Sequence, residues 1–197
     1  MTTLRLPDSW RPLQPLLDET GIERRLRDCI ETGRDVYPSP YSPDIFRALE
    51  LVAPVDVRVV ALGQDPYPTP GHATGLAFGV PPMTSPLPGS LRNICTEVMR
   101  DTDCIAVDYT LEGWARPGVL LLQTSLTCMG RPGDCHDWGW QEFTRCVLGH
   151  AVARSASKGV VFLFWGRKAE SAAVHLTYAG YEPVILTASH PSPLSHQ

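Results

Sequence analysis

The chain has 197 residues, 43% of them hydrophobic, and carries a formal net charge of −4. This length and apolar content are enough for one well-filled globular domain, and the negative charge excludes a general attraction to nucleic acid while leaving local contacts with DNA open. The longest apolar run, VVFLFW at 160–165, is too short to span a bilayer, and the N-terminal segment lacks the apolar core of a signal peptide. We therefore expect a single cytoplasmic domain over residues 1–197, with no membrane partner.

Helix and strand patterns alternate along the chain. The predicted elements are, in chain order, helices at 19–33 and 43–52, a strand at 57–62, a helix at 90–101, a strand at 119–123, a helix at 140–156, a strand at 160–165, a helix at 167–180 that ends at Gly180, and a strand at 183–188. The strand runs are almost continuously hydrophobic, which is typical of parallel strands covered on both faces. The sequence therefore predicts an α/β fold, a single domain with a central four-stranded parallel twisted sheet flanked by helices on both faces.

Polar and turn-forming residues follow the predicted strands. The first strand leads into GQDPYPTPGHATG, the second ends in a glutamine, the third leads into WGRKAE and the fourth into SHPSPLSHQ. In open parallel sheets, ligands bind at the carboxyl ends of the strands. We therefore expect one pocket, although its residues are far apart in the sequence, to contain Asp65, Tyr67, Gln123 and His190.

Asp65 and His190 carry the chemistry expected of this pocket. Each has an ordinary alternative role, since an aspartate before proline often caps a turn and a single loop histidine is usually a surface residue. Together, at strand ends, an aspartate and a histidine can serve as a water-activating base and an electrophile. This reasoning from the residues reaches a hydrolase-like pocket and does not identify the substrate.

The six cysteines include no CxxC pair. Cys128, Cys135 and His136 lie close in sequence and raise the question of a metal site. A structural zinc site normally has four regularly spaced ligands, so reduced thiols of a cytosolic protein are the favoured interpretation.

Three longer segments resemble the signature motifs of the family 1 uracil-DNA glycosylases: GQDPYPTPGHATGLAFGV, LLLQTSLT and HPSPLS. Supporting similarities lie in VYPSPYSPDIFRAL, PGSLRNI, GWARPGVLLL, WGWQEFT and FLFWGRKA, and the PYPTPGHA form is similar to the actinobacterial branch. The resemblance runs in register from about Trp10 to the C-terminus. It implies a monofunctional hydrolase that flips uracil out of single- or double-stranded DNA, excises it to start base excision repair, and needs no metal or cofactor.

The resemblance also implies roles for matched positions. Asp65 activates the attacking water and stabilises the oxocarbenium-like sugar, and His190 donates to uracil O2 as negative charge develops on the leaving base. Phe78 stacks on the flipped base, and Tyr67 fills the space beside uracil C5 so that the methyl group of thymine clashes. Gln64 faces the uracil carbonyls with its backbone amide and side chain.

Further matched positions are implied to contact DNA outside the pocket. Leu194 wedges into the gap left by the flipped base. Ser90 also has the pattern of an N-cap for the following helix. Phosphate binding by backbone amides and hydroxyls is compatible with the net charge, and we expect a monomer with a DNA-mimicking inhibitor protein as a further possible partner. The loops that pinch phosphates contain Ser85, Pro88, Ser90 and Ser192.

Gln123 departs from the family pattern. The position after LLL is normally an asparagine that donates to uracil O4 and accepts from N3–H, so Gln123 presents the same amide on a stem one methylene longer. A displacement of about 1 Å can cost about a hundredfold in rate. Three outcomes stay open, in descending order: weakened uracil excision, full activity in a pocket adjusted through Ala77 or Gly79, and altered base choice through acceptance from cytosine N4. We expect the Gln123 amide to bind the flipped base when DNA is present and water otherwise.

The end of the sequence is a second departure. The family usually continues past HPSPLS with an Arg-Gly-Phe-Phe-Gly-type segment and a helix, whereas this sequence stops at Gln197. The alternatives are a natural short paralogue and a cut chain, and in both we expect the loop with His190 and Leu194 to be more mobile. Two further hypotheses therefore stand beside the glycosylase: a DNA or uracil binder without turnover, and a glycosylase for another base.

Overall fold

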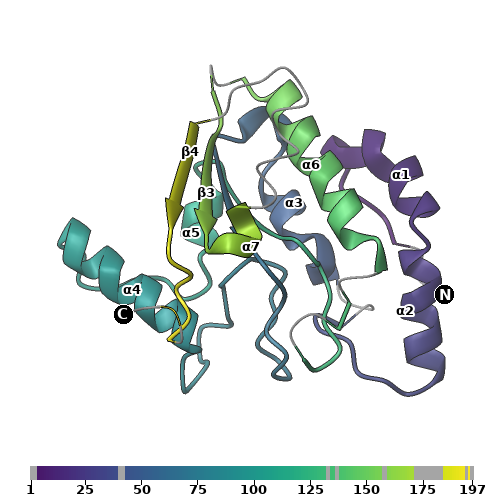
Figure 1. The fold of residues 1–197 in the computed structure, drawn as a ribbon, viewed down its shortest axis with the longest axis horizontal. Coiled ribbons are helices and arrows are strands. Elements are labelled where there is room, and N and C mark those ends of the chain that lie inside the picture. Colours follow the sequence, from purple (N-terminus) through teal and green to yellow (C-terminus); the bar gives the residue numbers. More distant parts are fainter. Residues whose placement is uncertain are drawn as a thin grey trace.

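Strands and helices alternate along the chain in the structure, a computed structural model that describes residues 4–39, 43–131, 134–135, 138–156, 159–170, 184–193 and 195 (Figure 1). The strands are β1 (Val59–Gly63), β2 (Val119–Gln123), β3 (Val161–Trp165) and β4 (Val184–Ala188). The helices are α1 (Gln14–Glu19), α2 (Ile22–Glu31), α3 (Arg47–Leu51), α4 (Gly89–Thr102), α5 (Glu112–Ala115), α6 (Trp140–Arg154) and α7 (Arg167–Glu170). Short 3₁₀ helices are η1 (Asp8–Leu13), η2 (Pro43–Phe46) and η3 (Pro54–Asp56).

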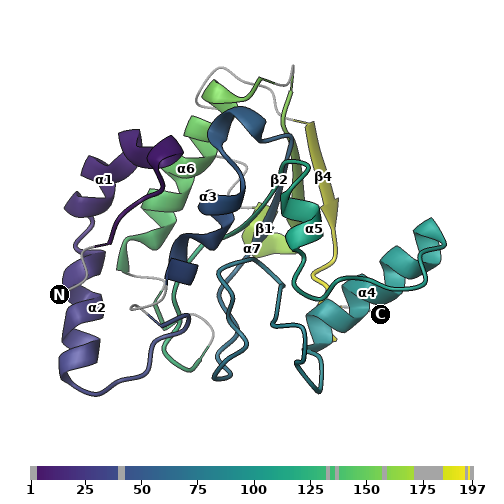
Figure 2. The ribbon, with the colours of Figure 1, turned by 180° about the vertical axis from the view of Figure 1, so that it is seen from behind.

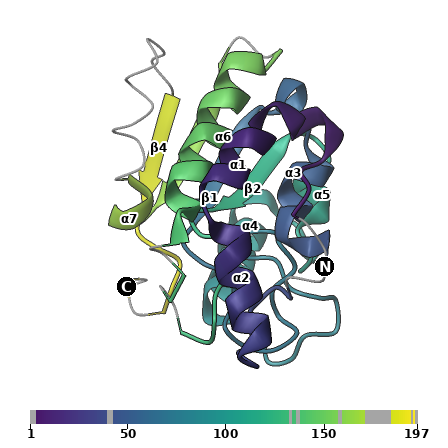
Figure 3. The same cartoon turned by 90° about the vertical axis from the view of Figure 1, so that its right-hand side faces the viewer.

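The four strands form one parallel sheet in the order β2-β1-β3-β4. Successive residues of a strand point to opposite faces, and Val60, Ala61 and Leu62 of β1 are all buried, so both faces of the central sheet are covered. Helices α1, α3 and α6 lie to one side of the strands and α4 lies to the other (Figures 1 and 3). The predicted α/β fold with a four-stranded parallel sheet is therefore confirmed.

Strand β4 forms one edge of the sheet, and its side chains are the most exposed of the four strands. Val184 and Leu186 expose 56% and 54% of their surface. Of the helix predicted at 167–180, the structure describes α7, and Gly180 lies outside the described residues.

Two fully buried tryptophans brace the segments around the sheet. The Trp10 indole N–H donates to the Val52 carbonyl at 3.0 Å, just after α3. The Trp140 indole N–H donates to Thr127 Oγ1 at 2.8 Å and so ties the start of α6 to the segment after β2. Because a buried indole needs a hydrogen-bond partner, these contacts fix both segments.

Helix α4 begins one residue earlier than predicted. Pro88 is its N-cap, with φ −54° and ψ 142°, and no side chain caps the first turn. The prediction that Ser90 is the N-cap is therefore wrong. Proline fixes φ and so favours the extended entry, which leaves Ser90 as the second helical residue.

The loops that follow the strands gather at one edge of the molecule. The strands β3 and β4 point toward this edge, and the loop that joins β1 to α4 lies beyond it (Figures 1 and 2). Parallel pairing requires that all four carboxyl ends meet there. Within the part of the chain that the structure describes, no helix is long and apolar enough to cross a membrane.

Candidate active site

The carboxyl ends of the strands surround a pocket of about 500 Å³. Every strand contributes to its wall: Gln64 follows β1, Thr124 follows β2, Trp165 and Arg167 lie at the end of β3, and His190 and Ser192 follow β4. Two residues predicted from the sequence, Gln64 and His190, therefore line the same cavity although 126 positions separate them.

The chain stays paired beyond the last residues of β1 and β2. The Gly63 carbonyl accepts a hydrogen bond from Thr124 N at 3.0 Å. The Gln64 carbonyl accepts from Ser125 N at 3.0 Å and from Thr124 Oγ1 at 2.8 Å. The exit of β1 is thus held on the exit of β2 up to the residue before Asp65.

Gln123 extends this pairing with its side chain. Gln123 is 6% exposed, and its Nε2 donates to the Asp65 backbone carbonyl at 2.9 Å. The longer stem of glutamine reaches a protein carbonyl, which satisfies one of the two Nε2 protons. That the amide binds water when DNA is absent stays a prediction for the other Nε2 proton and for Oε1.

The Asp65 carboxylate is held by its neighbour in sequence. Gln64 Nε2 donates to Asp65 Oδ2 at 2.6 Å, so the Gln64 side chain binds the carboxylate in this structure. Asp65 is half-buried, so part of the residue is in contact with solvent. A carboxylate that is fixed in place yet reachable by water suits a base that takes a proton from water.

His190 is oriented by the loop that carries it. Ser192 N donates to His190 Nδ1 at 3.0 Å, so Nδ1 is an acceptor and the proton of the neutral imidazole lies on Nε2. Asn93 Nδ2 of α4 donates to the Pro191 carbonyl at 2.8 Å and ties this loop to the helix. On the other side, a Cβ added at Gly166 would lie 2.9 Å from His190 Cβ, which shows how closely the two segments pack.

Two aromatic residues after β1 lie beside these groups. The ring centroid of Phe78 is 6.4 Å from that of His190 and 5.2 Å from that of Trp165. Phe78 has φ 68°, in the left-handed region that bulky residues rarely adopt, and its carbonyl accepts from the Tyr67 hydroxyl at 3.2 Å. Burial raises the pKa of Tyr67 well above its ordinary value, so the phenol stays neutral and remains a donor.

Of the other predicted site residues, Ser85, Pro88 and Ser90 are not among the residues that line the pocket. Ser85 is exposed and precedes a cis-proline, while Pro88 and Ser90 are half-buried at the start of α4. Ser192 lines the pocket and Leu194 lies outside the described residues.

No group of three or more potential metal ligands comes together in the described part of the chain. Cys128 and Cys135 are buried, and the Cys128 thiol donates to the Arg131 carbonyl at 2.9 Å. Burial raises the pKa of the Cys135 thiol to about 12 and also raises that of Cys128, which favours the protonated form of both thiols. His136 lies outside the described residues.

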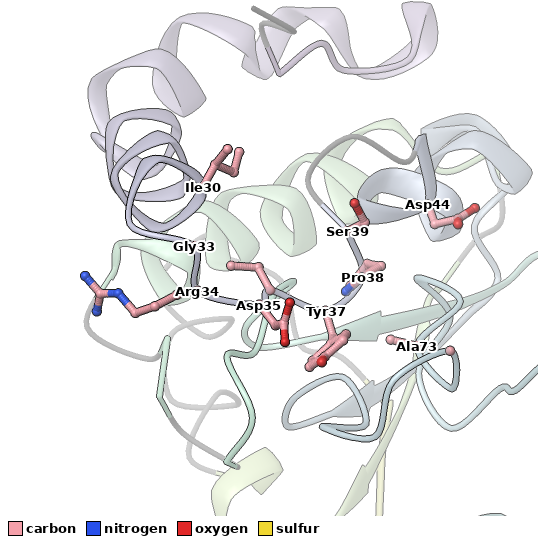
Figure 4. Close-up of a pocket in the computed structure, with 11 residues that line it drawn as sticks. Ile30, Gly33, Arg34, Asp35, Tyr37, Pro38, Ser39, Asp44 and Ala73 are labelled. Atoms are coloured by element: carbon pink, nitrogen blue, oxygen red, sulfur yellow. The ribbon is translucent and has the colours of Figure 1, made fainter.

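A second pocket, of about 600 Å³, is lined by other elements. Asp35 and Tyr37, from the segment after α2, lie next to each other on its wall, with Ala73 of the loop after β1 nearby (Figure 4). It contains none of the residues predicted for the site, so the pocket at the strand ends is the candidate active site.

Sequence reasoning missed three residues near this site. Trp165 and Arg167 line the pocket; Trp165 is the last residue of an apolar run and Arg167 comes two residues later, so the rule that pointed to the other strand ends would have found them. Asn93 acts from a helix on a loop almost a hundred residues later, and a single sequence carries no signal for that contact.

The fold and the pocket define a hydrolase-type site at the edge of a parallel sheet. His190, with its donor on Nε2, lines the pocket and has the Phe78 ring beside it, and Gln64, which also lines the pocket, holds the Asp65 carboxylate. This combination can activate water on one side of a flat leaving group and stabilise negative charge on the other.

Comparison with known proteins identifies the family. Residues 50–197 match the model of the uracil DNA glycosylase superfamily. The uracil-DNA glycosylase of Bordetella pertussis is 44% identical, over 96% of this chain and 74% of the relative, and that of Lysinibacillus sphaericus is 41% identical, over 96% and 84%. The crystal structure of mimivirus uracil-DNA glycosylase superposes on this chain with a TM-score of 0.83 at 25% sequence identity. The superposition covers 96% of this chain and 70% of the mimivirus chain. A variant of the mimivirus protein has been solved in complex with UGI. The chain belongs to the uracil-DNA glycosylase superfamily.

Proposed function

We propose that this chain excises uracil from DNA by hydrolysis of the N-glycosidic bond, with Asp65 as the base that activates water and His190 as the donor to the leaving uracil. Membership of the superfamily sets the reaction class, a hydrolase acting on N-glycosyl bonds that starts base excision repair. The observation that supports the assignment of residues is the pairing of a fixed carboxylate with an Nε2 donor at one sheet edge.

The two groups divide the chemistry of the reaction. Uracil leaves as an anion because its N1 keeps the electron pair of the broken bond, and His190 meets the charge that develops on O2. A donor already in place costs no rearrangement during the reaction, and removal of one such donor typically lowers kcat by about 10² to 10³. Asp65 accepts the hydrogen bond of the water that attacks C1′ and faces the positive charge of the sugar.

Base recognition is proposed for the rings and amides around the pocket. Phe78 stacks on the flipped base, and the Tyr67 ring occupies the space that a thymine methyl would need. Gln64, through its backbone amide, and Gln123 face the polar edge of the base. The change from asparagine to glutamine at this position adds a methylene to the group that reads uracil.

DNA contacts outside the pocket are proposed at two neighbouring loops. A Cβ added at Gly89 would lie 2.4 Å from Pro193 Cγ, so the start of α4 touches the loop that follows His190. The free N–H groups in the first turn of α4 suit a phosphate. The residues proposed to contact DNA are Ser85, Pro88, Ser90, Ser192 and Leu194.

Finer assignments follow the resemblance of the motifs. We assign the chain to family 1 and its actinobacterial branch, as one glycosylase domain over residues 1–197 that acts as a cytoplasmic monomer. Since a mimivirus UNG variant has been solved in complex with UGI, we also propose that a DNA-mimicking inhibitor binds this chain at the same edge.

An excision assay tests the proposed function. Single-stranded oligonucleotides with one U, C or T are incubated with the protein, and abasic sites are then cleaved with alkali. We expect cleavage at U alone. Asp65→Asn keeps the shape of the side chain and removes the base, so the rate should fall by about 10² to 10⁴ while binding of the oligonucleotide changes little.

Other outcomes would separate the alternatives. Binding without an abasic product from any base would overturn the proposal and favour a DNA or uracil binder without turnover. Cleavage at C would assign the chain to altered base choice. Equal losses of rate and binding in Asp65→Asn would contradict the role given to Asp65.

A further inference from the structure

The Gln123 amide contacts the catalytic residue itself. Its Nε2 donates to the Asp65 carbonyl at 2.9 Å, and the side chain is 6% exposed. Thr124 N and Ser125 N donate to the carbonyls of Gly63 and Gln64, and the Gln123 amide donates to the next carbonyl along the chain. The side chain therefore extends the pairing between β1 and β2 by one hydrogen bond. The buried amide is thus part of the structure that carries Asp65.

The peptide that Gln123 holds has only one group available for anchoring. The Asp65 carbonyl belongs to the peptide bond before Pro66, and proline has no backbone N–H. This peptide can therefore accept a hydrogen bond but cannot donate one. A donor on its carbonyl restricts the backbone rotation of Asp65 and hence the direction of its carboxylate.

The length of glutamine matters for this contact. Its stem is packed, since a Cβ added at Gly63 would lie 3.4 Å from Gln123 Cγ. An asparagine on the same backbone would have its amide about 1.5 Å further back, the length of one carbon–carbon bond. At that separation the hydrogen bond to Asp65 is lost.

The contact also fixes which atom of the Gln123 amide faces Asp65. A carbonyl only accepts, so the atom that faces Asp65 must be Nε2 and not Oε1. The remaining Nε2 proton and Oε1 are then the groups left for a base. One hydrogen bond thus orients both the catalytic residue and the side chain beside the pocket.

We propose that Gln123 is a positioning residue for Asp65: its side-chain amide holds the Asp65 carbonyl and so aims the carboxylate that activates water. This inference rests on the proposed function. It assigns Gln123 a role in the chemical step, whereas a residue that only reads uracil would act on the base.

A double-mutant cycle separates the two roles. Gln123→Met keeps the length of the side chain and removes the donor, and Asp65→Asn removes the base. Single-turnover excision of uracil should be about ten- to a hundredfold slower in Gln123→Met, because a misplaced group costs up to about a hundredfold. In the Asp65→Asn background the same change should cost less than about twofold, since there is no carboxylate to aim.

The competing result is equally specific. A residue that reads the base would show the same loss in both backgrounds, and that result would overturn the proposal, as would an unchanged rate in Gln123→Met. If the unsubstituted chain produces no abasic site, the proposed function fails before the cycle begins, so the two failures are distinguishable.

A measurement on the unsubstituted chain covers the case in which Gln123→Met does not fold. The side-chain amide of Gln123 should exchange its protons with solvent at least about tenfold more slowly than that of the exposed Gln141, because it is buried and bonded to a carbonyl. Equal exchange of the two amides by NMR would show that the contact is absent in solution and would overturn the proposal.

Discussion

Asp65 follows β1, a central strand buried on both faces, whereas His190 follows β4, the exposed edge strand. The Asp65 side is held by backbone pairing with the residues after β2 and by the Gln123 amide. The His190 side is held by the side chain of Asn93, by hydrogen bonds within its own loop and by close packing against Gly166. Asp65, the proposed base, is therefore positioned by the sheet, and His190, the proposed donor, is positioned by local contacts.

This difference predicts where the site is sensitive. A sheet distributes its restraint over many hydrogen bonds, so one lost contact moves it little. A loop that is held by local contacts is displaced more readily when one of them changes. Substitutions around His190 should therefore lower activity more than their effect on folding suggests.

Gly166→Ala should have the largest effect. Gly166 has φ 89°, which disfavours any side chain, and its new Cβ would lie 2.9 Å from His190 Cβ. We expect uracil excision to slow by about a hundredfold, the cost of displacing a reacting group by about 1 Å. The matched control is Gly149→Ala in α6, where nothing lies within 4 Å of the new methyl group. Equal rates in the two variants would show that the His190 loop adapts freely.

Asn93→Ala should have an intermediate effect. It removes the donor to the Pro191 carbonyl, and loss of a hydrogen bond of about 1 kcal/mol corresponds to about fivefold in kcat/KM. Asn93→Asp keeps the size of the side chain but not the donor, so its kcat/KM should equal that of Asn93→Ala. Thr96→Ala, one turn further on the exposed face of α4, is the control and should leave kcat/KM unchanged. An active Asn93→Asp beside a slow Asn93→Ala would mean that packing, not the hydrogen bond, holds the loop.

The smallest expected effect concerns cysteine labelling, which reports on the segment after β2. The Ser125 hydroxyl, just beyond β2, donates to the Thr127 carbonyl at 2.9 Å and lies 3.5 Å from the Cys135 carbonyl oxygen, and burial raises the pKa of Cys135 to about 12. At pH 8 only about one Cys135 thiol in ten thousand is ionised, so iodoacetamide should label the exposed Cys104 long before Cys135. Peptide mass spectrometry measures both rates. Similar rates in folded protein would indicate that the segment after β2 opens readily.

The sequence predicted the sheet because its signal is local and repeated. The runs VRVVAL and VLLLQ are apolar at every position except Arg58 and Gln123, and that pattern is typical of strands covered on both faces. The shared pocket then followed from parallel topology, which brings all four strand ends to one edge.

The remaining features depend on distances that one sequence does not encode. The partner of Gln123 is decided by whether its stem spans the gap to a particular carbonyl, and the motif alone points to a base or to water. The start of α4 is decided by competition between Pro88 and Ser90, two residues that both occur at helix beginnings. Phe78 at φ 68° has no local signal, because its conformation is imposed by its surroundings.

The hydrogen bond from the Tyr67 hydroxyl to the Phe78 carbonyl has a consequence for redesign of base choice. Holding Phe78 in the left-handed region costs about 1–2 kcal/mol, and this bond is one of the contacts that keep it there. Replacing Tyr67 by a small residue to admit a 5-methyl group would therefore also release the ring proposed to stack on the base. The size selection proposed for Tyr67 and the stacking proposed for Phe78 are therefore coupled, and a variant with a smaller residue at position 67 needs another contact to hold the Phe78 backbone.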